Sequence, residues 1–298
     1  KRKIDDFRAG EPAELDVMAS AAVANARQFV EVMGEMKGAA MKIGQILSAD
    51  PEMIDPGFAE KLSTLQNKAP PMDFVSLSSQ VEKNLDQPMS SVFRFFDSEP
   101  LGSASIGQVH RATLFDGREV AVKVQYPGIA DSLDSDLKNL GGLLKMGRAI
   151  VAKDRAEELM AEARDAIFAE ADYRIEANNL RTFRTLLSEW PDIRIPEPVD
   201  GLCTKEVLVM EFIEGVPLDE GINALPDPAE RNRLAERFAE LFVHLFHVCH
   251  QIHADPHPGN FLLTAEGQIG LLDFGCVRRF DPQVTDGVLK MVKAFLDD

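Results

Sequence analysis

The chain has 298 residues, of which 45% are hydrophobic, so it can bury a sizeable core and is longer than a usual single domain. Its 49 acidic and 32 basic residues give a formal net charge of −17, which opposes nonspecific attraction to nucleic acid and to anionic lipid. No stretch approaches the ~20 apolar residues of a membrane-spanning helix, no signal peptide begins the chain, and three scattered cysteines do not suggest a disulfide framework. These features predict a soluble, cytoplasmic protein that binds no nucleic acid.

The first part of the chain has a helical pattern. Apolar residues recur at helical spacing over 11–48, prolines then interrupt the pattern, and further helices are predicted over 56–65 and 74–85. Lys42 and Gln45 lie in the first segment, in Lys42-Ile43-Gly44-Gln45. Taken alone, this stretch is typical of an ordinary amphipathic helix with a solvated lysine.

Strands are predicted from Val92 to Tyr126, with a turn at Asp116-Gly117. The run 119–124 alternates in polarity and carries one lysine, Lys123, among Val and Ala residues. In protein kinases a V-A-I-K strand places this lysine on the α and β phosphates of ATP. Lys123 is therefore a candidate catalytic and nucleotide-binding residue, although the same pattern also fits an edge-strand lysine that reaches solvent.

The segment 101–110 precedes this strand, where a kinase carries its glycine-rich loop, but G-x-G-x-x-G is absent. Ser103, Ala104 and Ser105 are small enough to let backbone amides approach a phosphate. Because Ala and Ser restrict φ more than Gly does, we expect a stiffer loop at this position.

Two long helices are predicted over 131–151 and 155–187. The second carries Glu170, Asp172 and Glu176, and carboxylates in such a charged helix normally face water. Residues 170 and 176 would be separated by about 600° of helical rotation. They would point to different faces of the helix, so each could form its own ion pair.

The run Val207 to Phe212 predicts a strand that ends near Glu214-Gly215, a hinge whose backbone groups could contact adenine. Glu211 is included with this hinge as a candidate nucleotide-binding residue. A strong helical pattern then covers 228–250 and leads into the most informative segment of the chain.

That segment is His253 to Asn260, which has the H-x-D-x-x-x-x-N spacing of a kinase catalytic loop and is followed by an Asp273-Phe274-Gly275 motif. Asp255 would act at the attacking oxygen, while Asn260 and Asp273 would hold Mg²⁺. A hairpin between residues 261 and 272 would bring the last two together. Either motif alone could be a surface turn.

Histidines offer a rival interpretation. His244, His247 and His250 fall near one side of the predicted helix, close to Cys249, as the ligands of a zinc site could. A helix that leads into a catalytic loop also buries one face, so we favour a structural role for these side chains and expect no metal there.

Five ordered motifs resemble those of the UbiB family of atypical kinase-like proteins, which is associated with coenzyme Q biosynthesis. They are K-x-G-Q at residues 42–45, the alanine-rich loop at 101–110, E-x-D at 170–172, the catalytic loop and D-F-G. The resemblance implies an α+β, two-lobed protein-kinase-like fold. It divides the chain into an N-terminal helical extension (1–91), a small lobe with a helical insertion (92–214) and an incomplete large lobe (215–298).

The resemblance also implies roles for single residues. Glu176 would pair with Lys123, and Lys42 with Glu170. The K-x-G-Q helix would lie over the active site and suppress protein kinase activity, which gives regulatory roles to residues Lys42, Gln45, Glu170 and Asp172.

The function implied is Mg-dependent ATPase or small-molecule or lipid kinase activity that supports isoprenoid-quinone or related lipid metabolism. ATP or ADP and Mg²⁺ would be the cofactors, and a lipid or quinone precursor the further ligand, with peripheral membrane contact and a homodimer both compatible. Two alternatives stay open: an aminoglycoside- or choline-kinase-like phosphotransferase, and a nucleotide-switched scaffold without enzymatic activity. Only 23 residues follow Gly275, so the chain is expected to be a fragment.

Overall fold

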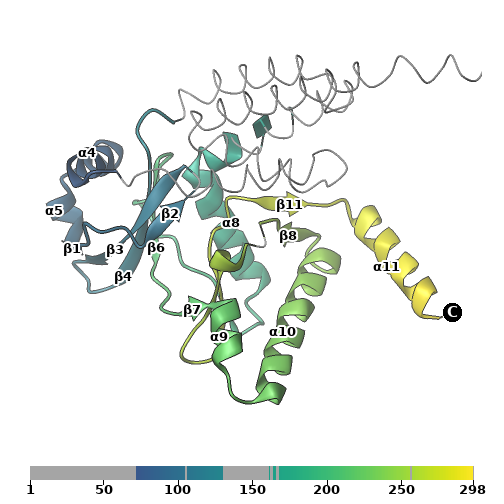
Figure 1. The fold of residues 1–298 in the computed structure, drawn as a ribbon. Coiled ribbons are helices and arrows are strands. Elements are labelled where there is room, and N and C mark those ends of the chain that lie inside the picture. Colours follow the sequence, from purple (N-terminus) through teal and green to yellow (C-terminus); the bar gives the residue numbers. More distant parts are fainter. Residues whose placement is uncertain are drawn as a thin grey trace, which may run out of the picture. The chain divides into compact units, whose positions relative to one another are not determined.

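The computed structural model describes residues 72–104, 106–129, 161, 164–165, 168–255 and 257–297. The chain divides into two compact units, one made of residues 1–73, 103–108 and 125–171, the other of residues 74–102, 109–124 and 172–298. Most of the described helices and strands belong to the second unit and are labelled in Figure 1. The division into three parts at residues 91 and 214 stays a prediction.

Five described strands form one sheet: β1 (Phe93–Phe96), β2 (Gly102–Ala104), β3 (Gly107–Leu114), β4 (Glu119–Gln125) and β6 (Val207–Glu211). The order is β1–β3–β4–β6, with β2 paired to β3. β4 is a central strand and is buried at every position after Glu119, as its Val-rich sequence predicts. Gly117 has φ +89° in the turn before β4, which confirms the predicted Asp116-Gly117 turn and explains its glycine.

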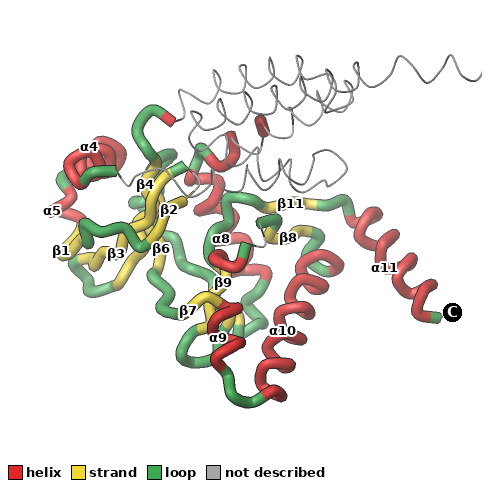
Figure 2. Tube along the Cα trace, in the orientation of Figure 1, coloured by secondary structure: helices red, strands yellow, loops and turns green. Residues whose placement is uncertain are grey.

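Two short helices, α4 (Phe74–Leu85) and α5 (Met89–Val92), pack on this sheet at β6 and β1 (Figure 2). The bounds of α4 are those predicted from the sequence. Its residues Leu77 and Val81 are one turn apart and completely buried, because residues four apart share one face of a helix.

The helix α8 (Tyr173–Leu186) follows Asp172, whose carboxylate caps the first turn by accepting the backbone N–H of Arg174. The predicted continuous helix over 155–187 is therefore wrong, because residues 171–172 are not helical. A capping aspartate satisfies backbone N–H groups that the helix itself leaves unpaired, and it starts a new helix at this point. Residues 170 and 176 are therefore not related by a regular helical rotation.

A second sheet contains β5 (Ile193–Arg194), β10 (Ile269–Leu271), β9 (Phe261–Leu263) and β7 (Val216–Pro217), in that order. β9 and β10 form the predicted hairpin, with Leu271 opposite Phe261 and Gly267 at φ +77° in its turn. A separate antiparallel pair, β8 (Gln251–His253) and β11 (Val277–Arg279), brackets the hairpin in the sequence.

Three helices complete the second unit: α9 (Leu218–Ala224), α10 (Pro228–His247) and α11 (Pro282–Leu296). α10 packs on α9, α11 and β8 (Figure 1). The prediction that this helix extends to His250 is wrong by three residues, because His250 has a left-handed φ of +53° that turns the chain into β8. Of the helices in the described ranges, none is both long enough and apolar enough to cross a bilayer.

Candidate functional site: a buried lysine between two carboxylates

Lys123 is buried in the middle of β4, where only 5% of its surface is exposed. Its Nζ lies 3.0 and 2.9 Å from the two carboxylate oxygens of Glu176 and 2.9 Å from Oδ2 of Asp273. These three side chains, here called the lysine centre, come from β4, α8 and the segment after β10. The predicted pairing of Lys123 with Glu176 is confirmed, and the alternative of an edge-strand lysine in solvent is wrong.

Glu176 reaches the lysine from the first turn of α8 and is 2% exposed. The same turn carries Tyr173, whose ring centroid lies 5.2 Å from the ammonium of Lys123 and adds a cation–π contact. The expectation that a carboxylate in this charged segment faces water fails for Glu176, because Lys123 compensates the cost of burying its charge.

Asp273 is held from two sides. Its Oδ2 accepts from Lys123, and its Oδ1 accepts the backbone N–H of Gly275 at 3.0 Å. The next residue, Phe274, is completely buried, with its ring centroid 4.8 Å from that of Phe183 and 5.2 Å from that of His253. The aromatic packing anchors the segment, while a third of the Asp273 side chain stays exposed.

The catalytic-loop candidates Asp255 and Asn260 come before the β9–β10 hairpin in the sequence, whereas Asp273 follows it. Asn260 ends a short 3₁₀ turn (Pro258–Asn260), and its Nδ2 donates to the backbone oxygen of Asp255 at 3.1 Å. The backbone N–H of Leu272 donates to the carbonyl of Asn260 at 2.9 Å. The hairpin thus brings residue 260 beside the strand end that carries Asp273, as the sequence predicted.

The electrostatics of the lysine centre follow from burial and mutual attraction. Burial acts to lower the pKa of Lys123, but the charges of Asp273 and Glu176 overcome it and hold that pKa well above its usual range. Burial raises the pKa of Glu176 to about 7, against the opposing effect of Lys123. Burial also acts to raise the pKa of Asp273, but Lys123 and the Gly275 N–H keep it below its usual value. Asp273 therefore stays ionised to lower pH than Glu176 does.

The donor set fits a magnesium ion. Asp273 supplies an ionised carboxylate, and Asn260 spends its amide N–H on Asp255, which leaves the amide oxygen as the group it can offer. Oxygen ligands suit Mg²⁺, which is usually held by one or two side chains together with substrate phosphates and water.

The connection from β6 to β7 covers residues 212–215 and contains Glu214-Gly215, whose role as a hinge stays a prediction. A Cβ on Gly215 would lie 2.9 Å from the carbonyl oxygen of Leu263, so a side chain there would collide with β9. The backbone N–H of Glu211 donates to Glu197 at 2.8 Å, and the N–H of Phe212 donates to Glu119 at 3.0 Å. The glycine therefore lets the hinge pass close to the strand that follows the catalytic loop.

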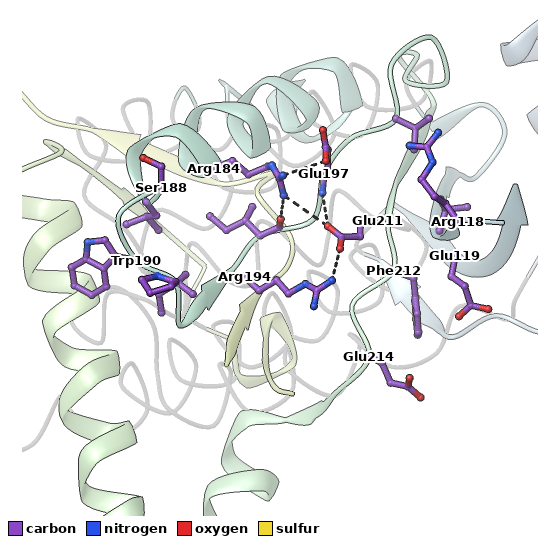
Figure 3. Close-up of a pocket in the computed structure, with 16 residues that line it drawn as sticks. Arg118, Glu119, Arg184, Ser188, Trp190, Arg194, Glu197, Glu211, Phe212 and Glu214 are labelled. Carbon is purple, nitrogen blue, oxygen red and sulfur yellow. Dashed lines mark hydrogen bonds and ion pairs between the residues drawn. The ribbon is translucent and has the colours of Figure 1, made fainter. Parts of the chain in front are cut away.

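The Glu211 side chain belongs to a different feature, a cavity of about 850 Å³ whose lining includes none of the lysine-centre residues. Figure 3 shows its carboxylate between Arg194 and Arg184. The nitrogen–oxygen distances are 2.5 Å to Arg194 and 3.8 Å to Arg184. Arg184 also pairs with Glu197 at 3.2 Å. We call these four residues the cavity cluster. The carboxylate of Glu211 is engaged there and its backbone N–H donates to the carbonyl of Glu197, so neither of these groups is left for a contact with adenine.

The remaining candidates are spread over the chain. Ser103 and Ala104 lie in β2, exposed and half-buried respectively. Asp172 caps α8 and pairs with Arg174, while Glu170 is partly exposed two residues before that cap. The other candidate residues and the other predicted helices lie outside the described residues: Lys42, Gln45 and Ser105, and the helices over 11–48, 56–65 and 131–151.

The histidines of the rival zinc interpretation do not share one helix face. His244 packs against Trp190 with ring centroids 4.9 Å apart, and Nδ1 of His250, beyond the end of α10, lies 2.7 Å from Oγ1 of Thr285. No group of three or more His, Cys, Asp or Glu side chains within the described ranges is placed to hold a metal ion.

Two features escaped the sequence analysis. One is the cavity cluster, whose members are scattered over residues 184–211 without a motif. The other is Asn179 in α8, which is 5% exposed and bonded to the D-F-G segment. Its spacing of three residues from Glu176, which places both on one helix face, is the signal that could have found it.

Comparison with known proteins was consistent with this geometry. A family model described as the ABC1 atypical kinase-like domain matches residues 64–298. The chain is 35% identical to the probable serine/threonine-protein kinase abkA of Dictyostelium discoideum, over 98% of this chain and 54% of that protein. It is 36% identical to the mitochondrial atypical kinase COQ8B of Rattus norvegicus, over 92% of this chain and 52% of that protein. The chain thus spans about half the length of these relatives.

Among solved structures, the chain is similar to Rv3197 from Mycobacterium tuberculosis, described as a complex with erythromycin. The TM-score is 0.60 with 35% sequence identity, and the match covers 91% of this chain and 68% of that one.

Proposed function

The chain belongs to the ABC1 atypical kinase-like family, and its helices and mainly antiparallel sheets agree with the α+β kinase-like fold predicted from its UbiB-type motifs; on that premise we propose that it binds MgATP and transfers or hydrolyses the γ-phosphate. The acceptor would be water or a small molecule or lipid, in support of isoprenoid-quinone or related lipid metabolism. The names of the COQ8 relatives, atypical kinases of mitochondria, favour this setting.

One observation carries the proposal: the buried Lys123 is shared between Glu176 and Asp273, within 3.0 Å of both. Burying a lysine with two carboxylates costs desolvation energy, and buried ion pairs contribute little net stability. Stability alone therefore does not account for this arrangement, which favours a functional role. In kinases the same three residue types align ATP phosphates and their metal. We infer that Lys123 contacts phosphate oxygens while Glu176 fixes its position.

The other residues then have defined tasks. Asp273 and Asn260 would hold Mg²⁺, which when bound neutralises charge on the β and γ phosphates. Asp255 would orient the attacking hydroxyl or water and accept its proton. Ser103, Ala104 and Ser105 would approach phosphate through backbone amides, and the hinge at 212–215 would contact adenine.

Regulation and location are part of the proposal as well. We infer that the K-x-G-Q segment with Lys42 and Gln45, together with Glu170 and Asp172, restricts access of protein substrates, and that the protein works in contact with a membrane or a lipid-like ligand. A homodimer is compatible with this arrangement.

The test is phosphate release from MgATP by the purified protein, measured with and without phospholipid vesicles and a small phenolic ring analogue. Asp273→Asn should reduce metal-dependent release by about 10²-fold or more, because it removes the charge that holds the metal on the phosphates. Asp219→Asn, at an exposed aspartate of α9 outside the lysine centre, is the matched control and should keep wild-type activity.

Other outcomes would select the alternatives. Tight nucleotide binding without turnover under any condition favours the nucleotide-switched scaffold. Rapid phosphorylation of an aminoglycoside or of choline would favour that class of phosphotransferase. Phosphate release that is equal in the wild type and in Asp273→Asn would contradict the proposed role of the lysine centre.

A further inference from the structure

A single buried amide joins α8 to the segment that follows the proposed metal-binding aspartate. Nδ2 of Asn179 donates to the backbone oxygen of Phe274 at 2.9 Å, and Oδ1 of Asn179 accepts from the guanidinium of Arg279 at 3.1 Å. Asn179 is 5% exposed, so both bonds are shielded from water on the helix side. One side chain thus contacts both ends of the stretch 274–279.

The two neighbours fix the orientation of this amide. A backbone carbonyl can only accept a hydrogen bond and a guanidinium can only donate, so the NH₂ group must face Phe274 and the oxygen must face Arg279. Among natural side chains of this size, only an asparagine supplies both groups. Aspartate would retain the acceptor for Arg279 but would turn a second oxygen toward the Phe274 carbonyl.

The position of Asn179 relative to Glu176 connects its bond with Phe274 to the lysine centre. The two residues are three apart on α8, so they lie on one face of the helix, and both are buried. Glu176 fixes Lys123, which binds Oδ2 of Asp273, while Asn179 fixes the carbonyl of the residue directly after Asp273. The aspartate is therefore braced by α8 through its side chain and through its backbone.

We propose that Asn179 is a positioning residue that sets the direction of the Asp273 carboxylate for magnesium by holding the Phe274 carbonyl on α8, with Arg279 as the outer partner of the amide. This inference rests on the proposed function, because it assumes that Asp273 holds Mg²⁺. Partners of this kind around a metal ligand typically change metal affinity or activity by about 10- to 100-fold when they are removed.

The experiment measures binding of a fluorescent N-methylanthraniloyl-ADP while Mg²⁺ is titrated, and binding of the same probe in EDTA. Asn179→Ala should raise the Mg²⁺ concentration for half-maximal binding by about 10-fold or more and leave the affinity in EDTA unchanged. Asn179→Asp, which keeps the size of the side chain, should have a similar effect. Arg279→Gln should have a smaller one, and Asn179→Ala should add less in that background than in the wild type.

Asn178→Ala is the matched control, since Asn178 is the exposed neighbour on the same helix and its side-chain oxygen accepts from Arg181 at 3.4 Å, away from Phe274 and Arg279. It should bind as the wild type does. Wild-type magnesium dependence in both Asn179 variants would overturn the inference, and so would a parallel loss of affinity in EDTA, which would indicate a general structural role. If the wild-type protein shows no magnesium-dependent binding at all, the proposed function fails and the inference fails with it.

Discussion

The lysine centre and the cavity cluster are two networks of opposite charges in the same unit, and both draw on α8 and on the sheet beside it. In the lysine centre the side chains of Lys123 and Glu176 are 6% and 3% exposed, while that of Asp273 is 33% exposed. In the cavity cluster the exposed fraction of the side chains ranges from 31% at Glu211 to 67% at Glu197. Glu176 lies in the first turn of α8 and Arg184 in the last, so one helix carries a member of each network.

The difference shows that short distances alone do not identify a functional site. Ion pairs near 3 Å occur in both networks, but water screens the cavity cluster, where each pair is worth about 0–1 kcal/mol. In the lysine centre Lys123 and Glu176 have lost most of their hydration and depend on one another, so removal of either one leaves an uncompensated buried charge. Function is therefore expected where the charges are expensive to keep.

The largest expected effect is the contrast between two variants in which methionine replaces a cation, one in each network. Lys123→Met leaves the buried carboxylate of Glu176 and the partly buried one of Asp273 without their cation. It should destabilise the protein by about 3–5 kcal/mol and reduce MgATP-dependent phosphate release by at least about 10²-fold. Arg194→Met, at a half-exposed arginine paired with Glu211, should cost less than about 1 kcal/mol and leave phosphate release near the wild-type rate.

Urea unfolding of both variants at pH 7.5, alongside phosphate release, measures this contrast. Equal losses of stability in the two variants would contradict the distinction between the networks. Comparison of the slopes of the unfolding transitions checks that both variants unfold by the same two-state process.

The second effect is a dependence of stability on pH in the nucleotide-free protein. Glu176 has a folded-state pKa of about 7, above its usual 4.5, so the folded protein binds this proton more tightly than the unfolded chain does. The stabilisation is complete below about pH 4.5 and is lost as the pH rises toward 7, with a slope of up to about −1.4 kcal/mol per pH unit. The lowered pKa of Asp273 changes the free energy of unfolding only below this pH window, and the raised pKa of Lys123 changes it only above the window.

The measurement is the free energy of unfolding of the wild type and of Glu176→Gln between pH 4.5 and 8, with EDTA present. The difference between the two should change across the window and become constant above it. Glu220→Gln, at an exposed glutamate of α9, is the control and should follow the wild type. A constant difference for Glu176→Gln would mean that this carboxylate titrates at its ordinary pKa in the folded protein.

The two regions also differ in how far the sequence predicts them. Lys123, Asp255, Asn260 and Asp273 lie in short motifs with fixed spacing, and the β9–β10 hairpin that joins two of them has clear turn and strand signals. The partner of Lys123 came from the family resemblance, because the pattern around Glu176 is that of a solvated helix face. Periodicity records which residues share a face, but not which face the rest of the fold covers.

The cavity cluster had no comparable signal, since Arg184, Arg194, Glu197 and Glu211 meet only after α8, β5 and β6 have assembled. The break before α8 was missed for a related reason. Asp172 is one of several acidic residues in a long helical pattern, and only its bond to the N–H of Arg174 identifies it as a cap. Local composition favours helix on both sides of that point.

This cap gives a third prediction, of about 0.5–2 kcal/mol, which is the usual cost of replacing a capping aspartate by alanine. Asp172→Ala should loosen the end of α8 that carries Glu176 and spare the end that carries Arg184. Hydrogen exchange should therefore increase at residues 173–177 more than at 183–186. Uniform exchange along α8 would show that the helix opens as one unit and that its two ends do not report separately on the two networks.

The smallest expected effect concerns salt. Glu197→Gln removes one partner of Arg184 at a side chain that is 67% exposed, so it should cost only a few tenths of a kcal/mol at low ionic strength. That cost should disappear near 1 M NaCl, where the Debye length is about 3 Å. The cost of Lys123→Met should change little under the same conditions, because Lys123 itself and its partner Glu176 are buried. Urea unfolding of both variants at low and high salt measures these costs. If the cost of Lys123→Met also fell at high salt, Lys123 would be in contact with solvent, and the two networks would not differ in the way described.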